Sequence, residues 1–198
     1  MSKRLFDVVA ASMGLLLLGP LLALVAIWIR LDSPGPALYR QQRVGRNGAL
    51  FSIYKFRTMR CDGGAGAELT VGRDHRITRA GHVLRAYKVD ELPQLFNVVA
   101  GSMSLVGPRP EVPRYVACYP EAVRQEVLSV APGITDWASI EYRQENAILG
   151  AASDPEQAYL DEVLPAKLAF YQRYVRERSF WLDLRIIANT VTALARTR

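Results

Sequence analysis

Residues 8–29 form an uninterrupted apolar stretch of 22 residues near the start of the chain, VVAASMGLLLLGPLLALVAIWI. A helix rises about 1.5 Å per residue, so this stretch would be roughly 33 Å long, which is enough to cross the hydrocarbon core of a bilayer. The stretch is long and no small-residue cleavage site follows it, which favours a retained segment over a cleaved signal peptide. The pattern therefore predicts a membrane segment.

Gly19 and Pro20 lie in the middle of this apolar stretch. Proline removes a helix hydrogen bond and disfavours helical geometry at the residue before it. The segment is therefore either a kinked spanning helix or a re-entrant helix–break–helix that returns to the face it entered. Basic residues flank both ends: Lys3 and Arg4 come before, and Arg30, Arg40, Arg43 and Arg46 come after. Because positive charge marks the cytoplasmic side, this pattern favours the re-entrant form, with both ends in the cytoplasm.

Beyond residue 37 the apolar pattern predicts short elements, most of them helices. Residues 50–59 are typical of a strand or hairpin arm, and the glycine-rich residues 61–73 of a loop without a phosphate-binding or dinucleotide signature. A helix capped by Thr78 is predicted to run through Tyr87, and the next helix begins near Asp90. Further helices are expected at 120–129, 156–163, 165–178 and 181–195. The predicted fold class is α+β, mostly helical with a small β element.

Two of these helices carry an apolar stripe. In the helix near Asp90, with Pro93 in its first turn, the stripe is formed by Leu92, Leu95, Phe96 and Val99. In the last helix it is formed by Trp181, Leu184, Ile187, Ala188, Val191 and Leu194. The opposite side of the last helix is only weakly polar, so this helix is either part of the core or an amphipathic helix that lies on the membrane surface.

The chain shows no internal repeat, and no low-complexity linker divides it. We therefore expect one domain, residues 1–198. Within it we expect a re-entrant membrane segment at residues 1–36, a cytoplasmic region at 37–180, and an interfacial helix and tail at 181–198.

Positive charge is concentrated in the middle of the chain. The formal net charge is +6; residues 38–114 hold 13 basic and 6 acidic residues, whereas residues 121–198 hold 9 and 11. Arginine outnumbers lysine 21 to 4, which suits planar recognition of phosphate oxygens. The charge indicates an anionic partner, which could be nucleic acid, a phosphorylated ligand or anionic lipid. A membrane-anchored nucleic-acid-binding protein is therefore one function to consider. No recognised nucleic-acid motif accompanies the charge, so we expect no nucleic-acid partner.

The cysteines and histidines point to neither a disulfide framework nor a zinc site. Cys61 and Cys118 are far apart in the chain and form no CxxC pair. His75 and His82 are the only histidines, and no third ligand follows at a suitable spacing. We therefore expect both cysteines to be reduced thiols, as in a cytosolic setting, and the histidines to have surface or structural roles.

Asp90 and Glu91 form the acidic pair of greatest chemical interest. At a helix start, unpaired backbone N–H groups converge and favour a carboxylate or a phosphate. Arg85 precedes the pair by five residues, and Arg109 is held between two prolines, Pro108 and Pro110. An arginine on a stiff loop loses little entropy on binding a phosphate. The alternative is that Asp90 is an ordinary helix cap and the Pro-Arg-Pro segment an ordinary connector.

Six segments together resemble a known family. They are KRLFD at 3–7, YKFRTM at 54–59, D-x-R-I-T-x-x-G-x-x-L-R at 74–85, DELPQLFNV at 90–98, GSMSLVGPRP at 101–110 and PGIT at 132–135. In this order they are similar to the monotopic polyprenyl-phosphate phosphoglycosyl transferases, a bacterial sugar transferase family that starts surface-glycan assembly. The resemblance covers nearly the whole chain, and DELPQLFNV followed by SLVGPRP is highly specific.

The resemblance implies a reaction. Members of the family transfer a phosphosugar from a UDP-sugar to undecaprenyl phosphate, release UMP and use Mg²⁺. Asp90 would be the nucleophile that forms an aspartyl-phosphosugar intermediate, and Glu91 would bind metal or handle a proton; both are candidate metal ligands. The residues implied to bind the phosphates are Lys55, Arg85, Arg143 and the Pro108-Arg109-Pro110 segment.

The resemblance also implies a place in the cell and the partners. It places the chain in the bacterial inner membrane, as a minimal form with its active site on the cytoplasmic face, in contact with membrane lipid and with room for a homodimer. Many members have a Ser-Pro break, where this chain has Gly19-Pro20. Many also read PGIT-Gly-Trp-Ala-Gln, where this chain has Asp136 and Ser139 in place of the glycine and glutamine. Asp136 would either accept hydrogen bonds from sugar hydroxyls or cap a turn.

Overall fold

The computed structural model describes residues 3–61, 74–142 and 145–195, without the side chains of residues 146–148. Its helices are α1 (Lys3–Asp32), α2 (Arg79–Ala86), α3 (Gln94–Ala100), α4 (Pro113–Ala117), α5 (Glu121–Val127), α6 (Trp137–Glu141), α7 (Glu145–Ala151), α8 (Pro155–Ala158), α9 (Leu164–Glu177) and α10 (Phe180–Ala195). Its strands are β1 (Leu38–Val44), β2 (Leu50–Phe56), β3 (Ser104–Val106) and β4 (Gly133–Thr135). Short 3₁₀ turns form η1 (Arg46–Gly48) and η2 (Val89–Glu91), and a π-helical turn, η3 (Tyr159–Val163), leads into α9.

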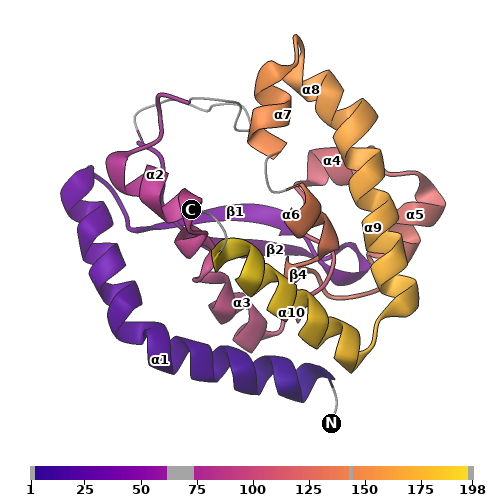
Figure 1. Cartoon of the computed structure of the whole chain (residues 1–198), viewed down its shortest axis with the longest axis horizontal. Coiled ribbons are helices and arrows are strands. Elements are labelled where there is room, and N and C mark those ends of the chain that lie inside the picture. The colour runs from indigo at the N-terminus through magenta and orange to yellow at the C-terminus, as the bar shows by residue number, and fades with distance from the viewer. Residues whose placement is uncertain (1–2, 62–73, 143–144, 196–198) are drawn as a thin grey trace.

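The mostly helical architecture with small β elements confirms the predicted fold class. In Figure 1, α1 follows one side of the molecule, the β1–β2 hairpin lies in the middle, and α4, α5, α7, α8 and α9 form the opposite side. Most of the predicted glycine-rich loop, residues 62–73, lies outside the described residues.

α1 is one helix of 30 residues that continues through Gly19 and Pro20. Figure 1 shows it bending along its length, but a break of the helix, as expected for a re-entrant segment, is not seen. Within the described ranges, α1 is the only helix that is long and apolar enough to cross a membrane. The structure therefore confirms a long apolar N-terminal helix.

Charged side chains tie the first turns of α1 to the rest of the protein. The carboxylate of Asp7 is buried and accepts hydrogen bonds from Ser104 Oγ at 2.7 Å and from the backbone N–H of Leu105 at 3.3 Å. Lys3 Nζ lies 2.5 Å from the buried carboxylate of Asp183 on α10. Arg4 donates to the Val98 and Val99 carbonyls at the end of α3 (2.5 and 3.0 Å). The start of the apolar helix is thereby fixed to β3, α3 and α10.

The other end of α1 is tied by Arg57, which is buried. Its guanidinium donates to the Ser33 hydroxyl at 2.6 Å, to the Ser33 carbonyl at 2.8 Å and to the Pro36 carbonyl at 2.6 Å. These acceptors include a carbonyl beyond the last turn of a helix, where no intrahelical donor is available. Asp32 accepts from the backbone N–H of Ala80 at 3.0 Å, which joins the end of α1 to the start of α2.

The antiparallel hairpin of β1 and β2 pairs Leu38 with Phe56 and Val44 with Leu50. The predicted strand at 50–59 therefore ends three residues early, at Phe56. Asn97 of α3 fastens the helix to β2: its Oδ1 accepts from the Tyr54 backbone N–H at 3.0 Å, and its Nδ2 donates to the Ser52 carbonyl at 2.8 Å. This contact sets the distance between β2 and the segment that precedes α3.

β3 and β4 form a second, parallel pair in which Ser104 lies opposite Gly133 and Val106 opposite Thr135. The two backbones approach so closely that a Cβ atom at Gly107 or at Gly133 would overlap backbone atoms of the other segment. Glycine is therefore required at both positions. Through this pairing the segment that carries Arg109 lies beside the segment that carries Asp136.

Several predicted helices are confirmed with shifted ends. Thr78 caps α2, with its Oγ1 accepting from the backbone N–H of Gly81 at 3.0 Å. The helix expected to begin near Asp90 is divided into η2 and α3, and the helix expected at 156–163 is a short α8 followed by the π-helical turn. The core beside α9 is formed by apolar and aromatic side chains from α4 to α9, among them Val112, Tyr115, Tyr159, Leu164 and Tyr171.

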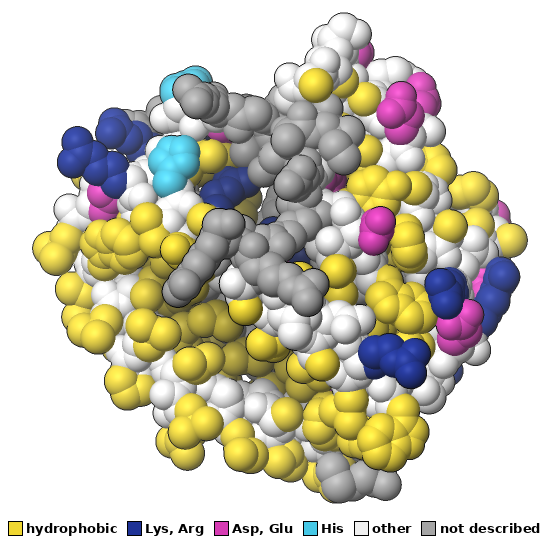
Figure 2. Space-filling view, viewed as in Figure 1, with side chains coloured by type: hydrophobic (Ala, Val, Ile, Leu, Met, Phe, Trp, Pro, Cys, Tyr) yellow, Lys and Arg dark blue, Asp and Glu magenta, His cyan; other side chains and the backbone are white. Residues whose placement is uncertain are grey.

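The apolar stripes of α3 and α10 face outward for part of their length. Phe96 is 51% exposed and Val99 is 37% exposed, whereas Gln94 and Asn97 of the same helix are buried. In α10 the buried apolar residues are Leu182 and Ile186, which do not belong to the predicted stripe. Trp181 and Val191 of that stripe are 78% and 60% exposed. Figure 2 shows hydrophobic side chains spread over the lower face of the molecule.

Candidate active site

Asp90 and Glu91 lie on η2, a single 3₁₀ turn between α2 and α3. Lys88, just before this turn, has a left-handed backbone with φ of 56°, which ends α2 and redirects the chain. The turn packs against β2, which carries Lys55. The two carboxylates are therefore held between the hairpin and the start of α3.

Glu91 is buried and has two cationic partners from distant parts of the chain. Arg109 binds it with both ends of the guanidinium: Nη1 lies 3.1 Å from Oε2 and Nη2 lies 2.5 Å from Oε1. Lys55 Nζ lies 3.3 Å from Oε1. A fork-shaped, two-contact arrangement of this kind is the strong form of an arginine–carboxylate pair.

These contacts shift the pKa values of all three groups. Burial alone would raise the pKa of Glu91, but the charges of Arg109 and Lys55 outweigh burial and hold that pKa well below its ordinary value. The charge of Glu91 raises the pKa of Arg109 well above its ordinary value. Burial lowers the pKa of Lys55 to about 8, against the opposing effect of Glu91. Glu91 is therefore ionised at neutral pH.

Asp90 has a different environment. Its Oδ1 atom is buried, and no group in the described ranges donates a hydrogen bond to it. Burial and the neighbouring charge of Glu91 raise the pKa of Asp90, while the charges of Lys55, Lys88 and Arg85 act in the opposite direction. Two adjacent carboxylates thus have pKa values shifted in opposite directions, an arrangement that is frequent where one fold carries out acid–base or nucleophilic chemistry.

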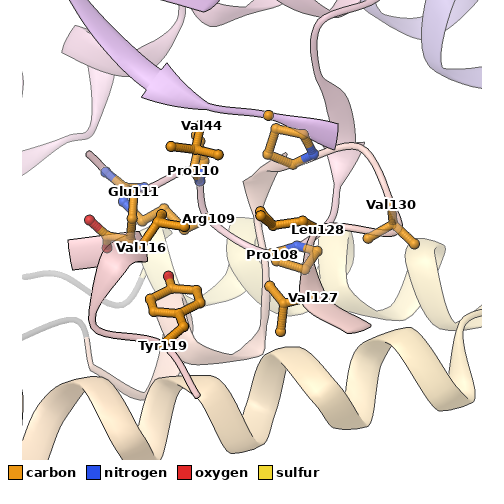
Figure 3. A pocket seen from close by; sticks show the side chains of 12 residues that line it. Val44, Pro108, Arg109, Pro110, Glu111, Val116, Tyr119, Val127, Leu128 and Val130 are labelled. Carbon is orange, nitrogen blue, oxygen red and sulfur yellow. The ribbon is translucent and has the colours of Figure 1, made fainter. Parts of the chain in front are cut away.

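Hydrogen bonds to its backbone carbonyls hold the Pro108-Arg109-Pro110 segment in place. Gly133 donates to the Pro108 carbonyl at 2.9 Å, and Arg43 Nη1 donates to the Pro110 carbonyl at 3.2 Å. In Figure 3, a small pocket beside this segment is lined by apolar side chains, among them those of Val116, Val127 and Leu128, and by Tyr119. The segment is therefore stiffened by its prolines and by its neighbours.

Glu111, which follows this segment, is a second buried carboxylate. It accepts from the Tyr159 hydroxyl at 2.9 Å and from Arg43 at 3.3 Å, and its carbonyl accepts from the Val44 backbone N–H at 2.9 Å. Glu111 and Tyr159 are not predicted by any sequence pattern, and Arg43 is predicted only as a charge flanking the apolar segment. No local pattern links these residues, because they come from separate elements.

The structure brings together four of the predicted site residues: Lys55, Asp90, Glu91 and Arg109. The charge of Arg85 lowers the pKa of Asp90. Within the described residues, the two side chains do not form an ion pair. Arg143 lies outside the described residues. In the described part of the chain, no three histidine, cysteine or acidic side chains gather as a metal cluster.

Asp136 is a cap. It is 1% exposed, and its carboxylate accepts from the Ser139 backbone N–H at 2.8 Å and from the Ser139 hydroxyl at 2.7 Å. Of the two roles left open by the sequence, the structure shows the capping role, at the start of α6. The two residues that replace the glycine and glutamine of the related sequences thus bind each other. The Asp-x-x-Ser spacing is the signal that could have predicted this pair.

Comparison with known proteins places this site in a family. The family model described as Bacterial sugar transferase matches residues 1–197. The UDP-glucose:undecaprenyl-phosphate glucose-1-phosphate transferase of Caulobacter vibrioides is 43% identical, over 98% of this chain and 70% of its own length. The UDP-N-acetylgalactosamine-undecaprenyl-phosphate N-acetylgalactosaminephosphotransferase of Aeromonas hydrophila is 37% identical, over 97% of this chain but only 43% of its own length. The exopolysaccharide production protein PSS of Rhizobium leguminosarum bv. phaseoli is 40% identical, over 96% of this chain and 94% of its own length.

Proposed function

We propose that this chain, which belongs to the bacterial sugar transferase family, transfers a sugar 1-phosphate from a UDP-sugar to undecaprenyl phosphate and releases UMP. This step would start the assembly of a surface polysaccharide. The observation that carries the proposal is the acidic pair of η2. Glu91 is held ionised by Arg109 and Lys55, beside a buried Asp90 with an unpartnered oxygen. The names of the relatives include both glucose and N-acetylgalactosamine, so the sugar is left open.

In the mechanism that we favour, Asp90 is the nucleophile. Its carboxylate oxygen attacks the phosphorus that carries the sugar, the bond from that phosphorus to the UMP oxygen breaks, and UMP leaves. An oxygen of undecaprenyl phosphate then attacks the aspartyl phosphosugar, and the Asp90 carboxylate is released. Covalent catalysis in two steps suits a reaction between a soluble donor and a membrane-bound acceptor.

The cationic side chains of the site reduce the electrostatic repulsion between the Asp90 carboxylate and the diphosphate of the donor. A carboxylate attacks an anionic diphosphate poorly unless nearby positive charge offsets the repulsion. Arg109 and Lys55 supply that charge beside Asp90, and Arg85 adds to it through its longer-range field. Glu91 keeps Arg109 in place until a phosphate binds. We also assign Arg143 to phosphate binding, on the resemblance alone.

Mg²⁺ fits the carboxylates of η2. Hard oxygen ligands are those that Mg²⁺ prefers, usually one or two carboxylates completed by water and substrate phosphates. Both oxygens of Glu91 are engaged by Arg109, whereas Asp90 Oδ1 is buried and unpartnered among the described residues, so Asp90 is the first candidate ligand and Glu91 the second. When bound, the ion would neutralise charge on the diphosphate.

The exposed apolar side chains suggest where the enzyme sits. The apolar face of α1, Phe96 and Val99 of α3, and Trp181 and Val191 of α10 are exposed to an extent that is unusual for a protein surrounded by water. We propose that these faces contact the inner membrane, with α1 as a re-entrant segment whose basic flanks both remain cytoplasmic. Residues 1–36, 37–180 and 181–198 would then be the anchor, the catalytic region and the interfacial helix.

Single-turnover analysis tests the proposal. Enzyme mixed with UDP-glucose or UDP-N-acetylgalactosamine and Mg²⁺, without lipid, should release UMP in an amount limited by the enzyme concentration, and the protein should gain the mass of one phosphosugar at Asp90. Asp90→Asn keeps the shape and removes the nucleophile, so both signals should disappear. If UMP appears only when undecaprenyl phosphate is present, and no adduct is trapped, transfer is direct and the acidic pair binds metal only.

The alternative function, a membrane-anchored nucleic-acid-binding protein, rests on the basic middle of the chain. Three of those arginines are engaged inside the protein: Arg57 with the end of α1, Arg43 with Glu111, and Arg109 with Glu91. The charge therefore has structural uses that need no nucleic acid. Salt-dependent binding of DNA without any release of UMP would favour the alternative.

A further inference from the structure

Behind Arg109 lies a buried polar group that the mechanism above does not use. The backbone of residues 133–135 runs beside the Arg109 segment, because Gly107 donates to the Thr135 carbonyl at 3.1 Å and Gly133 donates to the Pro108 carbonyl at 2.9 Å. Asp136 follows directly and is 1% exposed. A carboxylate is therefore enclosed within the protein beside the segment that carries Arg109.

Tyr171 reaches the same region from α9. The residue is 1% exposed, and its hydroxyl has no hydrogen-bond partner among the described residues. α6, which Asp136 caps, packs against α9, so the two side chains come from adjoining helices. Tyr171 packs in one cluster of buried residues with Val112, three residues after Arg109, and with Ala138, two residues after Asp136. The Asp136 carboxylate adds to the larger effect of Glu91 in raising the pKa of Arg109.

The unpartnered hydroxyl of Tyr171 differs from those of two other buried tyrosines, Tyr159 and Tyr174. The Tyr159 hydroxyl donates to Glu111 at 2.9 Å, and the Tyr174 hydroxyl donates to Asp183 at 2.8 Å and to the Val106 carbonyl at 3.0 Å. A buried hydroxyl without a partner costs about 1–3 kcal/mol of stability. A phenylalanine would avoid that cost, so the hydroxyl calls for a functional explanation.

We propose that Asp136 and Tyr171 are positioning residues for Arg109. Glu91 binds the guanidinium on the side of the acidic pair, and the Asp136 carboxylate attracts it from behind. The Tyr171 hydroxyl is placed to accept a hydrogen bond from the guanidinium when Arg109 turns from Glu91 toward a phosphate of the donor. This inference rests on the proposed function, because it assigns the two residues a part in binding that donor.

Tyr171→Phe separates a positioning role from a structural one. Because the hydroxyl has no partner, its removal should leave the midpoint of thermal unfolding unchanged or raise it. The kcat/KM for the UDP-sugar should nevertheless fall about tenfold, the equivalent of one hydrogen bond to a charged group. Tyr159→Phe is the matched control for stability, since it loses a bond to Glu111 and should lower the midpoint. Full activity of Tyr171→Phe would overturn the proposal.

Asp136→Asn tests whether the effect passes through Arg109. Asparagine can still cap α6, so the fold should be kept while the charge is lost. We expect kcat/KM to fall about tenfold in the wild-type background and to change little in an Arg109→Gln background, which is the signature of coupled residues. An equal loss in both backgrounds would contradict the proposal. If Asp136→Asn does not fold, Ser139→Ala takes its place in the comparison of the two backgrounds. This change removes the hydroxyl that donates to the Asp136 carboxylate.

A binding measurement keeps this inference distinct from the proposed function. The affinity for UDP, measured by calorimetry on wild type, Tyr171→Phe and Asp136→Asn, requires no turnover. We expect each variant to bind UDP several-fold more weakly than wild type. If the wild type binds UDP but never releases UMP from a UDP-sugar, the proposed function fails while the positioning roles still stand. If all three proteins bind UDP equally, the positioning roles fail.

Discussion

Replacing Arg109 with lysine is the most informative single change at the acidic pair. The substitution keeps the positive charge. It also keeps the backbone of the segment, because Pro108 and Pro110 are unchanged. It removes the planar fork, which is the feature that lets one side chain bind two oxygens at once. If Arg109 serves only as a source of charge, lysine should serve almost as well.

The size of the expected effect follows from the contacts of Arg109. The guanidinium reaches Glu91 through two nitrogens, at 3.1 and 2.5 Å, whereas a lysine can place one ammonium near one oxygen. Toward the donor, a lysine would likewise bind one phosphate oxygen where the guanidinium binds two, and one lost hydrogen bond to a charged group is worth about 1.5–3 kcal/mol. Because each 1.4 kcal/mol is a tenfold change in rate, we expect turnover to fall by at least about tenfold.

The assay is the initial rate of UMP release with UDP-sugar, undecaprenyl phosphate and Mg²⁺, together with thermal unfolding of each protein. Arg109→Gln, which lacks the charge as well, sets the lower limit and should be less active than the lysine variant. A lysine variant that is correctly folded and fully active would refute the reasoning, because it would show that the bidentate contact has no part in catalysis.

Three further predictions concern packing, pH and topology. Gly81→Ala should prevent folding or lower the unfolding midpoint by many degrees, because the new Cβ would overlap the Thr58 carbonyl; circular dichroism melting checks this. Lys55 has a pKa of about 8 in the folded protein, below its unfolded value of 10.5. Burial of the charged ammonium therefore lowers the unfolding free energy below pH 8. This cost is relieved as the pH rises from 8 toward 10.5, because the buried amine then loses its proton. The unfolding free energy should accordingly rise by up to about 3 kcal/mol over this range relative to Lys55→Met, whose pH curve should lack the rise; parallel curves would contradict the burial effect. Pro20→Leu should shift α1 toward a spanning helix, so that cysteines introduced at residues 2 and 47 become labelled from opposite sides, whereas in wild type they should be labelled from the same side.

Features that depend on residues close together in the sequence were predictable. The Thr78 cap, the apolar helix and the acidic pair each depend on residues that are close together in the chain, and the structure has all three features. The resemblance added Lys55, whose contact with Glu91 joins residues 36 positions apart and leaves no local pattern. Local patterns therefore did not predict contacts between residues that are far apart in the chain.

Other features were not predictable because they depend on tertiary contacts. The parallel pairing of β3 and β4 joins two three-residue segments that are too short to show a period, and the requirement for glycine at 107 and 133 arises only from their close approach. The stripe of α10 could belong to a core or to a membrane surface, since both environments favour the same residues. Leu182 and Ile186 face the core because Val106 and Tyr174 lie opposite them.

The hydrogen bonds of Arg57 have a consequence for anyone who wishes to work with a water-soluble version of this enzyme. The side chain of Arg57 is enclosed by carbonyl and hydroxyl groups of Ser33 and Pro36, which directly follow the apolar helix α1. Cutting the chain after residue 36 would leave this guanidinium buried without its acceptors at Ser33, would remove Asp32 from the start of α2, and would strip Asp7 from Ser104. The apolar helix α1 is thus an internal part of the fold, and a version of the protein that lacks it would lose all of these contacts.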